Sequence, residues 1–156
     1  MQNDTRNLWK MDLEFWNSGN AERAREVYAP KAVHREPGSK PILGPKHIAE
    51  RVARLRYAFP DFQLRFNSTH IHGDQFVLSW TSTGTHKGEF QGVPPTGKRI
   101  EIQGVSVGHI ENGRIRDEDL YYDRLAFLEQ TGVPPVLPHP EEPAMTLETT
   151  APVVVR

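Results

Sequence analysis

Apolar residues recur at helical spacing through the first part of the chain. Residues 5–17 and 46–59 repeat them at intervals of three and four, the period of a helix that buries one face. A shorter stretch, 21–28, fits another helix, because Asn20 can cap its start and Pro30 ends it. We therefore predict three helices before residue 60. The apolar positions of the two longer helices are Leu8, Met11, Phe15, Trp16, Ile48, Val52, Leu55 and Phe59.

From residue 62 onward the pattern changes to the alternation typical of β-strands. Asn112 and Gly113 form a strong hairpin signal before the last strand. A short helix or turn follows at residues 123–130, closed by Gly132. Helices followed by antiparallel strands predict an α+β domain, with helices packed on a strongly bent sheet and a pocket between the layers. The predicted strands are 32–36, 62–66, 75–85, 98–110 and 114–122.

Composition narrows the class of protein. The 156 residues suit one domain, placed at residues 1–132, and residues 133–156, which hold six of the 13 prolines, suit an extended or disordered tail. A net charge of −1 gives no reason to expect nucleic acid or a membrane as partner. The chain has no cysteine, which excludes disulfides and thiolate metal sites. The N-terminus lacks a signal-peptide pattern, so we expect a cytoplasmic protein.

Several segments in this order resemble the SnoaL-like polyketide cyclases of the nuclear transport factor 2-like superfamily. They are Trp16-Asn17-Ser18-Gly19-Asn20, Phe59-Pro60-Asp61-Phe62, the run from Gly84 to Ile115 with Gly-Thr-His and Gly-Val-Pro-Pro-Thr-Gly-Lys, and Asp123 followed by Leu125, Leu128, Gln130 and Gly132. The resemblance covers about residues 8–132. It implies a cone-shaped α+β barrel that closes rings in polyketide-like carbonyl compounds by intramolecular aldol chemistry, without a cofactor, in antibiotic biosynthesis.

Asp123 is the leading candidate for the acid/base. Apolar residues flank it, and burial raises the pKa of a carboxyl group toward the working pH of a general acid or base. The alternative is a helix N-cap, a common place for aspartate. The resemblance implies the catalytic role, and it implies that His109 assists. Strand alternation puts His109 on one face with Gln103. An exposed hairpin histidine is the alternative for His109.

The first strand offers either His34 or Arg35 to the pocket, since alternate residues face opposite sides. The resemblance implies that this strand contributes a polar side chain to the pocket, and alignment with the family on Pro37 favours Arg35, which would bind an enolate oxygen or a carboxylate. A solvated edge strand is the alternative. The further substrate-binding candidates are Gln103, Tyr121, His86, Trp80, Phe15 and Trp16. The seven histidines lack helical His-x-x-x-His spacing, so we expect no metal site.

Two other functions stay open. The same fold resembles epoxide hydrolases, isomerases, dehydratases and pericyclic cyclases, and Arg35 beside an aspartate would suit epoxide opening. A binding module without catalysis is the third hypothesis, which substitution of Asp123 would separate from the first. Apolar residues on the outward sheet face, such as Val77 or Ile102, predict a homodimer.

Overall fold

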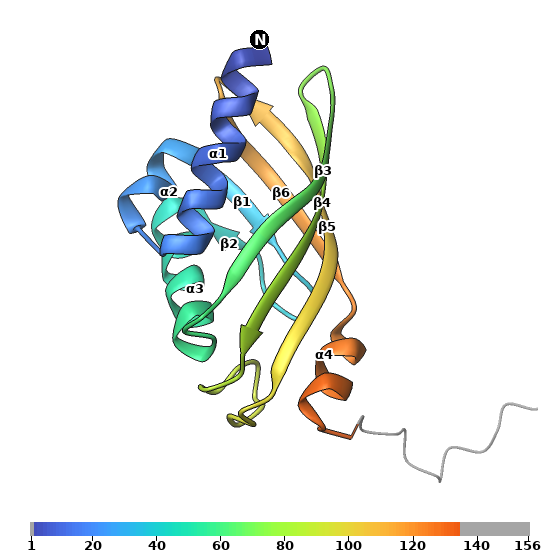
Figure 1. Ribbon diagram of the computed structural model, residues 1–156. Helices are drawn as coiled ribbons and strands as arrows, with labels where there is room; N and C mark the ends of the chain where they lie inside the picture. Colours follow the sequence, from blue (N-terminus) through green and yellow to red (C-terminus); the bar gives the residue numbers. More distant parts are fainter. Residues whose placement is uncertain (1, 135–156) are drawn as a thin grey trace, which may run out of the picture.

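The computed structural model describes residues 2–134, with side chains from Thr5 onward, and this part of the chain folds into four helices and six strands (Figure 1). In chain order the elements are α1 (Gln2–Ser18), α2 (Ala21–Val27), β1 (Tyr28–Arg35), β2 (Ile42–Leu43), α3 (Gly44–Ala58), β3 (Gln63–His72), β4 (Gln75–Thr85), β5 (Arg99–Glu111), β6 (Arg114–Tyr122) and α4 (Arg124–Thr131). The predicted tail lies outside the described residues, apart from 133 and 134.

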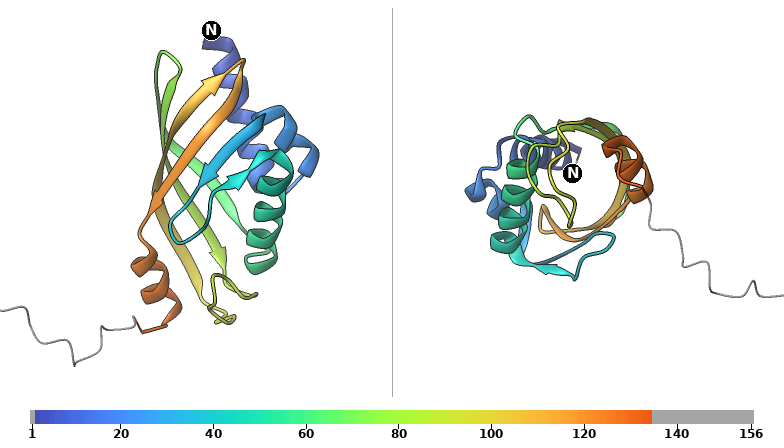
Figure 2. Two further views of the ribbon diagram at one scale, coloured as in Figure 1. Left: turned by 180° about the vertical axis from the view of Figure 1, so that it is seen from behind. Right: turned by 90° about the horizontal axis from the view of Figure 1, so that it is seen from below.

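The predicted α+β class is confirmed. Helices α1, α2 and α3 cover one side of the curved sheet. Helix α4 follows the C-terminal end of β6 and lies beside the start of β5 (Figure 1). Seen from below, the sheet bends around and the helices close the open side (Figure 2). None of the described helices is long and apolar enough to cross a membrane.

The sheet is mixed, so the prediction of a wholly antiparallel sheet was wrong. Its strand order is β2-β1-β6-β5-β4-β3, and every neighbouring pair is antiparallel except β1 with β6, which run parallel. Strand β1 also begins at Tyr28, earlier than predicted, and contains Pro30. The β1–β6 register is irregular between Tyr28 and Val33, so Pro30 lies where a missing N–H donor interrupts no regular ladder.

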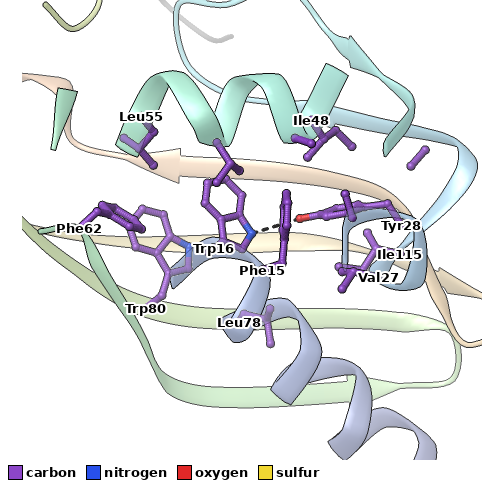
Figure 3. Close-up of a cluster of buried hydrophobic side chains, with 14 of the residues drawn as sticks. Phe15, Trp16, Val27, Tyr28, Ile48, Leu55, Phe62, Leu78, Trp80 and Ile115 are labelled. Atoms are coloured by element: carbon purple, nitrogen blue, oxygen red, sulfur yellow. Dashed lines mark hydrogen bonds between the residues drawn. The ribbon is translucent and has the colours of Figure 1, made fainter. Parts of the chain in front are cut away.

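The core lies between the concave face of the sheet and the helices. Phe15, Tyr28, Ile48 and Ile115 are at most 1% exposed there, and Figure 3 shows aromatic and aliphatic side chains from α1, α2, α3 and the strands gathered together. Because these side chains interdigitate from both layers, they fix the distance between helices and sheet.

Two glycines on β5 make room for large rings of β4. A Cβ at Gly104 would overlap the Trp80 indole, and a Cβ at Gly108 would overlap the Phe76 ring. Both aromatic residues are buried on the concave face. The glycines therefore let the sheet bend closely around its own aromatic side chains.

Candidate functional site

A largely apolar cavity lies between the helices and the concave face of the sheet. Four charged or acidic side chains interrupt its apolar lining, and we call this group, Asp12, Glu36, Arg51 and Glu118, the polar wall. The cavity is further lined by Trp16, Leu55, Phe59, Phe62, Leu64, Phe66, Trp80, Ser82, Phe90, Ile100, Ile102, Ser106, Leu120, Tyr122 and Phe127. Apolar pockets with a few convergent polar groups are typical small-molecule sites.

His34 and Glu118 face each other across the parallel strand pair. They are register partners on β1 and β6, and His34 Nδ1 lies 3.2 Å from Glu118 Oε2. Both side chains are at most 3% exposed. Glu118 lines the cavity, whereas His34 lies behind it. The imidazole therefore fixes the orientation of the Glu118 carboxyl group without meeting the cavity itself.

Glu36 and Arg51 form the second part of the polar wall. Arg51 Nε and Nη2 donate to the two carboxylate oxygens of Glu36 at 2.5 and 3.1 Å. The guanidinium carbon also lies 5.3 Å from the centre of the Phe90 ring, a cation–π distance. His34 Nε2 lies 3.7 Å from Glu36 Oε2, an ion-pair distance longer than a hydrogen bond. The histidine thus lies between two carboxyl groups.

Burial and neighbouring charges set the protonation of these groups. Burial opposes a charge on His34, but the hydrogen bonds and charges of Glu118 and Glu36 outweigh it and raise its pKa to about 9. Burial likewise opposes a charge on Glu36, yet His34 and Arg51 hold its pKa down at about 2. At neutral pH His34 is therefore an imidazolium and Glu36 a carboxylate.

Asp12 enters the cavity from α1, where it is 1% exposed. The Tyr28 hydroxyl oxygen lies 3.4 Å from Asp12 Oδ1 and 3.3 Å from Glu118 Oε2, so it bridges the two carboxyl groups. Trp16 Nε1 donates to the same hydroxyl at 3.2 Å (Figure 3). Burial, and then the charge of Glu118, raise the pKa of Asp12 well above its usual value. The raised pKa favours the protonated form of Asp12.

The predicted acid/base, Asp123, lies outside the cavity lining. It is the N-cap of α4, and its Oδ1 accepts from Leu125 N at 2.8 Å and Ala126 N at 3.2 Å. These bonds satisfy backbone donors that begin a helix. The geometry therefore favours the capping alternative for Asp123, and the carboxyl groups in the cavity are Asp12, Glu36 and Glu118.

His109, Gln103 and Tyr121 point to the convex side of the sheet, opposite to the prediction. Residues Ile100 and Ile102 of β5 are buried, so the even-numbered face of this strand turns inward. His109 Nδ1 instead lies 2.8 Å from Asp117 Oδ1 on the outer face. On β6, Tyr121 is 61% exposed. The alternation along β5 was predicted correctly, but the odd-numbered residues were expected to face the cavity, and the even-numbered residues do so.

The choice of Arg35 over His34 was also wrong. Arg35 is exposed and pairs with Asp119 at 3.2 Å, while His34 is buried. Arg35 therefore lies away from the cavity. Epoxide opening, which depended on Arg35 beside an aspartate in the pocket, loses its support.

The aromatic candidates divide between cavity and core. Trp16 and Trp80 line the cavity, and their contact with a ligand stays a prediction. Phe15 is buried outside the lining. His86, also outside the lining, stacks on Phe59 at 5.2 Å, and its Nδ1 lies 3.0 Å from Thr96 Oγ1.

Sequence reasoning missed the polar wall, although a signal was present. Asp12 stands one turn from Leu8 and from Trp16 on the apolar stripe of α1. Arg51 likewise lies about one helical turn from both Ile48 and Leu55, on the apolar stripe of α3. A charged residue inside an apolar stripe is buried, and a buried charge needs a partner or a neutral state. No group of three or more side chains among the described residues is arranged to hold a metal ion.

A family model and a named relative both match most of this chain, and both describe cyclases. A family model described as SnoaL-like polyketide cyclase matches residues 7–131. The aklanonic acid methyl ester cyclase DnrD of Streptomyces peucetius is 28% identical over 128 residues, which cover 78% of this chain and 86% of DnrD.

Solved structures share the fold. IdmH of Streptomyces antibioticus superposes with a TM-score of 0.71 at 28% identity, covering 83% of this chain and 99% of IdmH. TsrD of Streptomyces laurentii gives a TM-score of 0.79 at 21% identity, covering 86% of this chain and 98% of TsrD.

Proposed function

Because this chain belongs to the SnoaL-like polyketide cyclase family, we propose that it closes a ring in a polyketide-type carbonyl compound by an intramolecular aldol-type reaction. Among its relatives are cyclases named for aklanonic acid methyl ester. We propose a substrate of that class, an aromatic or polycyclic ester with an acidic C–H between carbonyl groups. The predominantly apolar and aromatic lining of the cavity supports a ligand of this kind.

Glu118 is the proposed base, and its place in the cavity is the single observation that carries the proposal. It is the carboxylate of the polar wall held by the buried His34 imidazolium. In the proposed reaction Glu118 removes the acidic C–H proton, the enolate carbon attacks a carbonyl in the same molecule, and a C–C bond forms. Protonation of the resulting alkoxide gives a product isomeric with the substrate. A fixed base next to an enclosed substrate supplies both proximity and proton transfer.

The test is conversion of aklanonic acid methyl ester by wild type, Glu118→Gln and Asp123→Asn. Chromatography with absorption detection follows loss of the ester and appearance of an isomer of equal mass. We expect turnover by wild type and by Asp123→Asn, and a loss of about 100-fold or more in Glu118→Gln. Loss of turnover in Asp123→Asn with full activity in Glu118→Gln would return the catalytic role to Asp123.

The proposed assembly is a homodimer through the convex face of the sheet. Val77 and Val107 are register partners there, each 38% exposed. Ile102, the other predicted contact, is buried and lines the cavity, so it is not part of this surface. Light scattering should give twice the chain mass for wild type and the chain mass for Val77→Lys. A cytoplasmic location stays a prediction.

A further inference from the structure

We infer that Asp12 is the proton donor of the proposed reaction and that the Tyr28 hydroxyl returns the proton from Glu118 to Asp12 after each turnover. This inference rests on the proposed aldol-type function and adds a donor and a return path to it. Asp12 and Glu118 both line the cavity, and the Tyr28 hydroxyl oxygen is 3.4 Å from one carboxyl group and 3.3 Å from the other.

The two carboxyl groups suit opposite roles. Glu118 lies 3.2 Å from His34 and forms an ion pair with the protonated imidazole. None of the ion pairs among the described residues includes Asp12, and its polar neighbours are Tyr28 and Trp16. Burial and then the nearby Glu118 raise the pKa of Asp12, while the hydrogen bond with Tyr28 and then the charge of His34 oppose this more weakly. A pair of carboxyl groups with opposite protonation provides a base and an acid in one cavity.

The hydrogen-bond directions follow from a count of protons. The Tyr28 phenol has one hydrogen, so it cannot donate to Asp12 and Glu118 at once. With Asp12 protonated, the Asp12 carboxyl donates to the phenol oxygen and the phenol donates to the Glu118 carboxylate. Trp16 Nε1 also donates to the phenol oxygen and holds it in place. Burial raises the pKa of Tyr28 well above its usual value, which keeps the phenol neutral.

The proton balance of the reaction requires a return path. Glu118 gains the C–H proton of the substrate, and Asp12 gives its own proton to the alkoxide, so each turnover ends with the two carboxyl groups in exchanged states. Protonated Glu118 then donates to the Tyr28 oxygen while the phenol hydrogen passes to Asp12. No proton is gained or lost overall. Since the two carboxyl-bearing residues are 3% and 1% exposed, the phenol is a shorter path than bulk water.

Two measurements test the inference separately from the proposed reaction. Infrared spectra at neutral pH, without substrate, should show the C=O band of a protonated carboxyl group in wild type and lose it in Asp12→Asn. With aklanonic acid methyl ester, Asp12→Asn should slow the first turnover by about 100-fold. Tyr28→Phe should keep the rate of the first turnover and lower the steady-state rate by about tenfold or more, so that product appears in a burst equal to the enzyme concentration.

Tyr57→Phe is the matched control, because Tyr57 is 75% exposed on α3 and should change none of these quantities. A protonated-carboxyl band that persists in Asp12→Asn would overturn the assignment of Asp12. Steady-state turnover in Tyr28→Phe equal to wild type, without a burst, would overturn the return path. If wild type fails to convert the ester, the proposed reaction falls, and the infrared comparison alone then supports or overturns the neutral Asp12.

Discussion

His34 and Glu118 are 84 residues apart in sequence and meet as direct register partners on two parallel strands. Their hydrogen bond joins the first strand in the chain, β1, to the last, β6. Because both side chains are buried, water cannot replace either partner of this hydrogen bond. Removing one partner would therefore leave the other without a polar contact at that atom.

The stability of the fold should depend on the charge of His34. Its folded pKa of about 9 exceeds the ordinary value of 6.5, so its contribution is full below pH 6.5 and is lost as the pH rises through about 9. The groups facing it are Glu118, Glu36 and Asp12. Urea unfolding from pH 6 to pH 10 should show the free energy of unfolding of wild type approach that of His34→Gln by about 3 kcal/mol. A constant difference between the two proteins across this range would contradict it.

The Arg51–Glu36 pair should be costly to break from one side. Arg51→Met leaves the 8% exposed Glu36 without its bidentate partner, and we expect a loss of about 3–5 kcal/mol in the free energy of unfolding. The double variant Glu36→Gln/Arg51→Met removes the stranded charge and should recover much of that loss. A double-mutant cycle measured by urea unfolding checks this. Equal stability of the single and double variants would argue against a stranded charge.

The Arg51–Glu36 pair should also set how far the pH can fall before the protein unfolds. The pKa of Glu36 is about 2 in the fold against an ordinary 4.5, so its stabilising contribution is present above pH 4.5 and is lost as the pH falls through about 2. Acid unfolding followed by circular dichroism should therefore occur at higher pH for Arg51→Met than for wild type. An unchanged midpoint would show that Arg51 does not hold this pKa down.

Gly104 should tolerate no side chain while Trp80 lies over it. Gly104→Ala places a methyl group against the indole ring, and we expect a loss of about 1–3 kcal/mol in the free energy of unfolding. Trp80→Phe shortens that ring, so the methyl group should cost less in the Trp80→Phe background than in wild type. Thermal unfolding of the four proteins measures the difference. If Gly104→Ala lowered the free energy of unfolding equally in both backgrounds, contact with the Trp80 ring would not be the cause.

Asp123 should matter for stability and not for turnover. Asp123→Ala removes both backbone hydrogen bonds of the α4 cap and should cost about 1 kcal/mol, whereas Asp123→Asn keeps an acceptor and should cost less. Urea unfolding measures the stability, and conversion of the ester measures turnover. Loss of turnover in both variants at unchanged stability would contradict the capping role.

Local patterns predicted most of the fold. The repeat of Ile48, Val52 and Leu55 indicated α3, and the Asn112-Gly113 turn indicated the β5–β6 hairpin; both are confirmed. Each of these signals lies within a few residues of the element it describes. The parallel β1–β6 pair carries no such signal, because its two strands lie far apart in the chain.

The site was harder to predict because the inward face of β5 is ambiguous in sequence. One face carries Ile100 and Ile102, while the other carries Val105 and Val107, so both contain apolar residues. The packing of Trp80 against Gly104 and of Phe76 against Gly108 decides between them. Choosing the wrong set placed His109 inside and left Glu118 unnoticed. The pairing of His34 with Glu118 then depended on a strand contact that alternation does not reveal.

The parallel pairing of β1 with β6 also affects how the protein is made. Synthesis runs from the N-terminus, so β1 leaves the ribosome long before the strand that it must join. The β3–β4 and β5–β6 hairpins connect neighbouring segments and close short loops, whereas β1 must close a long one. Until β6 is complete, His34 has no carboxylate from that strand beside it. A nascent chain that stops before residue 114 therefore carries helices α1, α2 and α3 and the Asp12 carboxyl group, but it lacks Glu118, the partner on the other side of the cavity.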